Sequence, residues 1–315
     1  MHRIAAALLA LTLALPAAGQ ERTVRILVGF PAGASLDSMT RLVAEKMRAS
    51  LGQPVVVENR PGAAGQIAMT AVKAAAPDGL TIVMTPLVTV VTAPHVQALP
   101  YHPFNDFAPV AHAANFLFAL GMGPSTPAKD LKEYLALAKQ DPKYANYASA
   151  GTGSLPHFFS LLLAEKAGVK MNHIGYKGTA QAMTDLLGGQ IAAFMGTVAD
   201  VGPQHKAGKV VAVATSGAQR SRHLPDVPTF KELGYDIVGG GWYAAYAPAG
   251  TPAPAVDRLS KAIIAGLNAP EVRERLDNFG MEPTGYGPAE LARIHRHDYE
   301  LWGPVIKASG FKPGG

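Results

Sequence analysis

The sequence predicts an α/β protein of about two domains, in which short strands alternate with covering helices. Runs of β-branched and apolar residues alternate with segments of helical period along most of the chain. The 315 residues allow roughly two domains at about 150 residues each. A glycine run at 239–241 breaks the chain before a late strand, at an expected domain crossing. Because there is no cysteine, the core alone must hold this fold.

The first elements follow a strand–helix–strand–helix–strand order. We expect strands at 23–30, 54–59 and 80–84, with helices at 36–51 and 67–76 between them. Leu36, Met39, Val43 and Met47 fall on one face of the first helix, and Gly52 marks its end. This order predicts a parallel sheet covered by helices.

The pattern loosens and then resumes. Residues 85–109 contain five prolines and are expected to form loops with one short helix. Further strands are expected at 116–122, 146–150, 191–195, 210–215 and 242–247, and further helices at 128–139, 154–167 and 179–187. Residues 254–308 are expected to be helical, with prolines at the starts of two segments.

The N-terminus predicts export. A short basic start precedes an apolar run at 4–15 and small residues at 16–19, which is typical of a signal peptide cleaved near Gly19/Gln20. The run is too short to span a bilayer, which takes about 20 residues. The net charge is +5 without a basic run, so small anions are better partners than nucleic acid.

Two loops share one pattern and could face each other across a cleft. "GFPAGASLD" (29–37) and "ASAGTGSLPH" (148–157) each follow a strand with a glycine and alanine turn, a serine and a helix. Ser35 and Ser154 are the expected N-caps. A helix N-terminus presents free N–H donors that bind carboxylate or phosphate. Neither loop has the lysine of a nucleotide-binding P-loop.

Catalytic and metal patterns are weak. No serine lies in a G-x-S-x-G elbow. His295 and His297 are two residues apart on an expected helix, so they point in different directions, and we expect both at the solvated surface. Trp242 could line a pocket or fill core.

Several segments together resemble the substrate-binding proteins of tripartite tricarboxylate transporters, the Bug family. They include "LGQPVVVENRPGAAGQIAMTAVKAAAPDG", "GYKGTAQAMTDLLGGQI" and "SRHLPDVPTFKELGY", and the match runs from about Val24 to the C-terminus. The resemblance implies a hinged type II periplasmic binding protein with a mixed sheet in each domain. It assigns residues 1–19 to the signal peptide, 20–121 plus 240–315 to domain 1, and 122–239 to domain 2.

The resemblance also implies capture of a small carboxylate by backbone N–H groups of the two loops and its delivery to integral-membrane transporter subunits. Carried over by position, the residues of one jaw are Phe30, Ala32, Gly33, Ala34, Ser35 and Asp37. Those of the other jaw are Gly151, Thr152, Gly153, Ser154 and His157. Those expected near the distal end of the ligand are Thr85, Gly196, Thr197 and Trp242.

Gly196 stands where many members carry an acid, so we expect added room and a dicarboxylate, including an aromatic one, rather than an amino acid. No enzyme activity, cofactor or metal is expected, and the protein is expected to be monomeric. An exported sensor and an exported hydrolase remain the alternatives.

Overall fold

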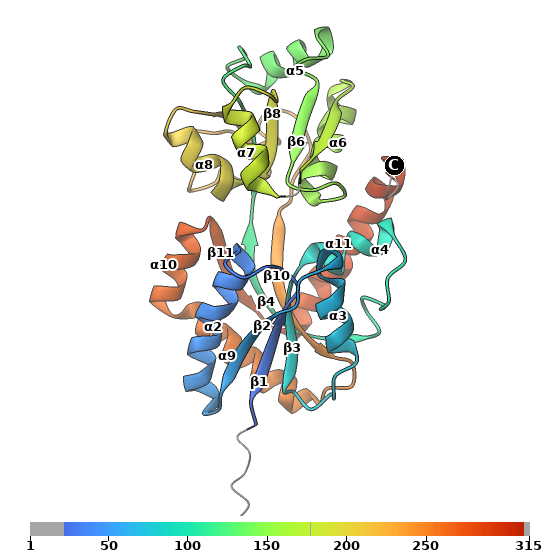
Figure 1. Cartoon of the computed structure of the whole chain (residues 1–315), viewed down its shortest axis with the longest axis vertical. Helices are drawn as coiled ribbons and strands as arrows, with labels where there is room; N and C mark the ends of the chain where they lie inside the picture. Colours follow the sequence, from blue (N-terminus) through green and yellow to red (C-terminus); the bar gives the residue numbers. More distant parts are fainter. Residues whose placement is uncertain (1–21, 177, 312–315) are drawn as a thin grey trace, which may run out of the picture.

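The computed structural model describes residues 22–176 and 178–311, so the predicted signal peptide lies outside the described residues. The described chain forms two lobes, each built on one mixed β-sheet with helices on its faces (Figure 1). This is the predicted α/β architecture. Within the described part of the chain, no helix is long and apolar enough to cross a membrane.

The larger lobe contains a six-stranded sheet in the order β11-β4-β10-β3-β1-β2. Its strands are β1 (Val24–Val28), β2 (Val55–Asn59), β3 (Thr81–Pro86), β4 (Phe107–Phe116), β10 (Gly241–Pro248) and β11 (Met281–Tyr286). Its helices are α2 (Ser35–Leu51), η1 (Ala63–Gly65), α3 (Gln66–Lys73), η2 (Leu87–Thr89), α4 (Ala93–Val96), α9 (Ala253–Asn268), α10 (Pro270–Asn278) and α11 (Pro288–Ala308).

The smaller lobe contains a five-stranded sheet in the order β7-β6-β8-β5-β9. Its strands are β5 (Phe118–Met122), β6 (Asn146–Ser149), β7 (Asn172–Gly175), β8 (Ala193–Thr197) and β9 (Val211–Thr215). Its helices are α5 (Leu131–Gln140), α6 (Leu155–Ala167), α7 (Thr179–Leu187) and α8 (Val198–Lys206).

The chain crosses between the lobes twice. β4 ends at Phe116 and β5 begins at Phe118, so the first crossing is at Leu117. The second crossing lies between β9 and β10 and includes the glycine run at 239–241. The predicted first boundary at 121 is therefore too late, because β5 pairs with β8 and β9 of the smaller lobe.

Two predicted assignments need correction, and two elements were not predicted. The segment 107–115 is part of the ten-residue strand β4, which pairs with β10 on one side and β11 on the other. The sequence of β4 shows no clear alternation of apolar and polar residues, because small alanines and His112 are buried along with Val110. Residues 281–286, expected to be helical, form the edge strand β11. α8 and β7 were not predicted, since Pro203 lies inside the short α8 and β7 is only four residues long.

An apolar core joins the two lobes along α11. The Phe159 ring of α6 lies 5.3 Å from Phe118 and 5.1 Å from Trp302, which belongs to α11 of the larger lobe. Figure 1 shows the C-terminal part of α11 rising beside α6. A helix of one lobe thus packs on a helix of the other.

Candidate functional site

The sheet topology brings the strand ends of both lobes to the boundary between them. In the smaller lobe, Phe118 at the start of β5 pairs with Thr197 at the end of β8. β6 and β7 run parallel to β8, so their C-terminal ends lie at the same edge. In the larger lobe, β10 enters beside Pro86 at the end of β3, and β1 runs parallel to β3. Ligands of open α/β sheets bind at such strand ends.

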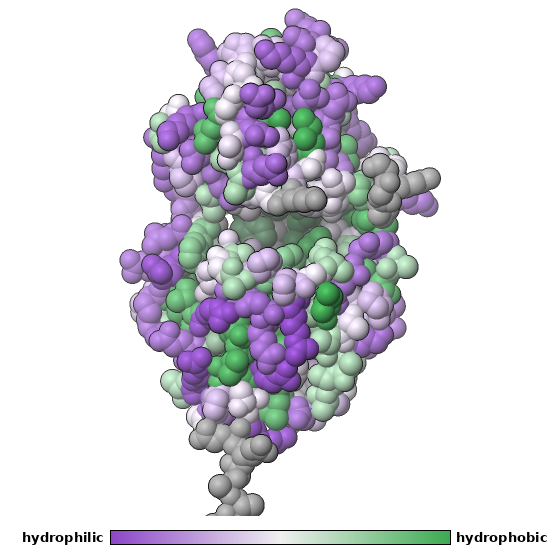
Figure 2. Space-filling model, viewed as in Figure 1, coloured by the Kyte–Doolittle hydropathy of each residue, from purple (hydrophilic) through white to green (hydrophobic). Residues whose placement is uncertain are grey.

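A hollow lies between the lobes at this boundary, as the space-filling view shows (Figure 2). The helices α2, α6, α7 and α8 each follow a strand that ends there, so their N-termini are directed to the boundary. The geometry therefore concentrates helix N-termini of both lobes around one cleft.

The first predicted loop is exposed and leads into a helix without a side-chain cap. Residues 31–35 are exposed, and Ser35 is the first helical residue. The predicted N-cap was wrong by one position, because Ala34 holds the extended N-cap conformation and has no side chain that could bond the helix. The first N–H groups of α2 therefore have neither an intrahelical acceptor nor a side-chain cap.

Asp37 holds this loop in place. Its carboxylate is buried and accepts hydrogen bonds from the Gly33 N–H at 2.9 Å, the Arg41 guanidinium at 3.0 Å and the Asn59 amide at 2.8 Å. Burial alone would raise the pKa of Asp37, but the hydrogen bonds from Arg41, Gly33 and Asn59 outweigh it and lower the pKa. Because these donors occupy both carboxylate oxygens, Asp37 positions the loop.

The second loop uses the same arrangement. The Gly153 N–H donates to Nδ1 of His157, four residues on, at 3.1 Å. Gly153 has φ +75° and Gly33 has φ +84°, so each loop turns on a glycine in the left-handed region. Ser154 holds the predicted N-cap position, yet its side chain makes no cap bond. The sequence echo is thus a structural echo, with two uncapped helix N-termini in opposite lobes.

His157 is buried in an aromatic stack. Its ring centroid lies 3.8 Å from that of His173, with the two rings nearly parallel, and 5.4 Å from that of Phe311, with the two rings nearly perpendicular. Burial lowers the pKa of both histidines to about 4, so both are neutral at pH 7. His173 in turn contacts Ser149 Oγ at 2.8 Å, and Ser149 donates to the Gly151 carbonyl at 3.0 Å. The stacked His157 and His173 therefore hold the base of the second loop in place.

The four predicted distal residues lie in different environments. Thr85 is buried and its hydroxyl is paired with Thr89 at 2.8 Å. A Cβ at Gly196 would lie 2.1 Å from the Phe194 ring, so this ring fills the space that we expected to be free. Thr197 caps α8 through a capping box with Asp200. Trp242 is buried and donates to Asp298 at 2.7 Å, which places it in the wall of a separate cavity at the hinge.

Asp200 is a cleft residue that sequence reasoning missed. Its carboxylate accepts from the Thr197 N–H at 3.1 Å and the Thr197 hydroxyl at 2.7 Å. Burial raises its pKa, and the Thr197 and Thr179 hydrogen bonds offset only part of this rise. An acid therefore stands at the end of β8 although position 196 is glycine. The T-x-x-D spacing of a capping box was the available signal.

Among the described residues, no group of three or more acidic, histidine or cysteine side chains could hold a metal ion. The two histidines predicted at the surface lie in different environments. His297 is exposed, as predicted. The prediction for His295 was wrong, because its ring is buried, stacks on Phe104 at 4.4 Å and contacts the Val90 carbonyl at 3.1 Å.

Two mixed-sheet lobes, a double crossing and a cleft lined by helix N-termini define the periplasmic solute-binding class of proteins. Within that class, the family model described as "Tripartite tricarboxylate transporter family receptor" matches residues 39–311. The chain belongs to this family, which includes the Bug proteins.

Individual relatives agree. The "UPF0065 protein in gbd 5'region" of Cupriavidus necator is 37% identical over 313 residues, which is 98% of this chain and 95% of that protein. The structure of the periplasmic binding protein BugD is similar with a TM-score of 0.79 and 35% identity, covering 92% of this chain and 98% of BugD. MatC from Rhodopseudomonas palustris, solved with bound malate, has a TM-score of 0.78 and 33% identity, covering 90% of this chain and 98% of MatC. An R. palustris protein solved with adipate has a TM-score of 0.82 and 28% identity, covering 91% of this chain and 97% of that protein.

Proposed function

We propose that this protein acts in the periplasm, where it captures a small di- or tricarboxylate in the cleft and delivers it to the membrane subunits of a tripartite tricarboxylate transporter. The matched pair of uncapped helix N-termini, α2 in one lobe and α6 in the other, carries this proposal. Two sets of N–H donors from opposite lobes suit an anion that both lobes contact when they close. The malate and adipate bound to relatives support a carboxylate ligand.

The two lobes would act as the moving domains, with the crossings at Leu117 and at 239–241 as the hinge. Closure would bury the ligand, and binding would shift the open–closed equilibrium. In the proposed role the ligand binds reversibly and no covalent bond forms or breaks. Nδ1 of His157 already accepts the Gly153 N–H, so this nitrogen is not free to take a proton from Ser154.

A ligand panel tests this role. Malate, adipate, citrate, phthalate and aspartate are compared by thermal unfolding. A ligand at a hundred times its dissociation constant stabilises the native state by about 2.7 kcal/mol, so we expect a shift of several degrees for di- or tricarboxylates. A flat panel, together with turnover of a simple ester, would contradict the proposal in favour of a hydrolase. Aspartate is a dicarboxylate that also carries an ammonium group, so a shift with aspartate alone would indicate an amino-acid ligand and contradict the expected ammonium-free acid.

Ser35→Pro tests whether the backbone N–H group of residue 35, at the N-terminus of α2, binds the carboxylate. Proline is tolerated at the first helical position, and Ala34 already has the extended conformation that precedes proline (φ −70°, ψ 163°). The change therefore removes one N–H group and leaves the helix intact. We expect carboxylate affinity, measured by calorimetry, to fall by about tenfold, the worth of one charge-assisted hydrogen bond.

Ser35→Ala is the matched control, because it removes the hydroxyl and keeps the N–H group. Its affinity should equal that of the wild type. If both variants bind as well as the wild type, the α2 N-terminus is not part of the site.

A further inference from the structure

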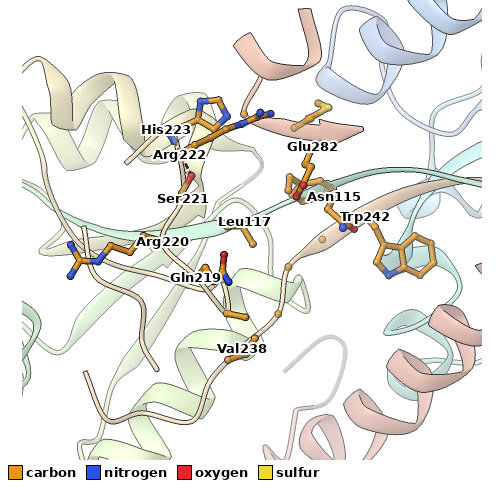
Figure 3. A pocket seen from close by; sticks show the side chains of 18 of the residues that line it. Asn115, Leu117, Gln219, Arg220, Ser221, Arg222, His223, Val238, Trp242 and Glu282 are labelled. Carbon is orange, nitrogen blue, oxygen red and sulfur yellow. Dashed lines mark hydrogen bonds between the residues drawn. The ribbon is translucent and has the colours of Figure 1, made fainter. Parts of the chain in front are cut away.

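A second cavity lies at the hinge, apart from the two loops. Its volume is about 640 Å³, within the range of small-molecule sites. Both crossings line it, through Phe116 and Leu117 on one and 238–241 on the other. Figure 3 shows Arg222 of the smaller lobe and Glu282 of the larger lobe at its walls. Since both lobes contribute, the cavity is a structural feature of the hinge itself.

Two arginines and two acids line the cavity, and their charges are not equally compensated by partners outside it. The two arginines of its wall are already neutralised, Arg220 by Glu232 at 3.0 Å and Arg222 by Asp277 at 2.5 Å. The side chain of Glu282, by contrast, is exposed and makes no hydrogen bond or ion pair with any residue of the described chain.

A second carboxylate belongs to the same wall. Asp298 lines the cavity and accepts the Trp242 N–H at 2.7 Å. The uncompensated charge of the walls is therefore negative. A carboxylate ligand would be repelled here, whereas a cation would be attracted.

His112 adds an unused hydrogen-bond acceptor. It lines the cavity, is 1% exposed, and its Nε2 has no partner among the described residues. In the tautomer that satisfies the His112 carbonyl, Thr284 donates its hydroxyl hydrogen to that carbonyl at 3.2 Å, and Nδ1 of His112, 2.7 Å from the Thr284 oxygen, carries the ring hydrogen. Nε2 is left with a lone pair. A buried acceptor without a donor costs about 1–3 kcal/mol, which a donor group in the cavity would relieve.

An aromatic ring lies beside this acceptor. The Trp242 ring centroid is 5.5 Å from that of His112, and Trp242 is itself held by Asp298. Indole is the best aromatic partner for a cation in proteins. An unpaired carboxylate, an anchored carboxylate, a neutral imidazole acceptor and an indole thus share one cavity, and each of them attracts an N–H donor with positive charge.

We propose that the hinge cavity is a second binding site, which takes a small organic cation with an ammonium or guanidinium group. The cation would donate to His112 Nε2 and Glu282 and lie against Trp242. This site is independent of carboxylate capture, and its chemistry is opposite to that of the cleft.

Tryptophan fluorescence gives a direct test, because the chain has only two tryptophans. In Trp302→Phe, Trp242 is the sole emitter. Methylammonium, putrescine and agmatine are titrated into this variant, and equilibrium dialysis of labelled putrescine against the wild type provides a second measurement. We expect saturable binding of at least one probe with a dissociation constant below about 1 mM.

Glu282→Gln is the test variant and should weaken binding at least fivefold, since Glu282 is exposed and its loss leaves the fold intact. Glu274→Gln, an exposed acid of α10 outside the cavity, is the matched control and should bind as the Trp302→Phe protein does. The proposal is overturned if no probe saturates up to about 10 mM by either measurement, or if both variants lose affinity equally.

Discussion

Acidification from pH 7 to pH 5 should lower the free energy of unfolding by several kcal/mol. Burial lowers the pKa of four histidines, His112, His157, His173 and His295, to about 4, against an ordinary value near 6.5. Between these two values the unfolded chain binds protons that the folded chain does not. The contribution of these neutral histidines to the free energy of unfolding is therefore fully present above pH 6.5 and is lost as pH falls towards 4.

The size of this effect follows from the shifts. Each pKa unit corresponds to about 1.4 kcal/mol, so at pH 5 each histidine contributes on the order of 1–2 kcal/mol of lost stability. Typical total stabilities are about 5–15 kcal/mol, so four such groups remove a large part of the total. The protonated His157 would also lose the Nδ1 lone pair that holds Gly153, so carboxylate affinity should fall together with stability.

Urea unfolding at pH 7, 6 and 5 measures this dependence. His295→Gln removes one buried titrating group and should flatten the profile, whatever its stability at pH 7. His297→Gln, at an exposed position two residues away, should leave the profile unchanged. Equal unfolding free energies at pH 7 and pH 5 in the wild type would show that the four imidazoles are not held neutral.

The two jaw loops could be predicted because their information is local. A strand, a glycine turn and a helix start within a dozen residues, and the same pattern recurs at 148–157. The N-cap of α2 was misplaced by one residue. Serine is a preferred N-cap residue type, but Ala34, not Ser35, has the extended N-cap conformation. Local pattern thus located the loops better than the termini of their helices.

Features set by distant partners could not be read in this way. β4 is a strand because β10 and β11 pair with it, although its sequence is rich in alanine and contains proline. His295 lies on a helix with polar neighbours, yet Phe104 and Val90 from far along the chain bury it. Phe194, two residues from Gly196, turns back over that glycine and removes the predicted room. In each case tertiary packing decided what the local pattern left open.

Gly153→Val should abolish carboxylate binding, and the structure changes the expected reason. A Cβ at Gly153 would lie 3.2 Å from the ring of Phe311, which follows the end of α11, so the added side chain meets this ring. Gly153 also has φ +75°, where a β-branched residue is strained by about 1–3 kcal/mol. Relief of either conflict must move the N–H groups of 151–154, and carboxylate affinity should fall more than tenfold.

Gly168→Val is a control that introduces similar backbone strain outside the second loop. Gly168 has φ +62° at the C-terminal end of α6, and a Cβ there has no neighbour within 4 Å. This control should lose comparable stability in urea but bind the carboxylate as the wild type does. In the double variant Gly153→Val with Phe311→Ala, the steric conflict is removed and the strain remains, so affinity should recover in part. Wild-type affinity in Gly153→Val would instead mean that the second loop does not hold the ligand, because a displaced set of donors cannot keep the same hydrogen bonds.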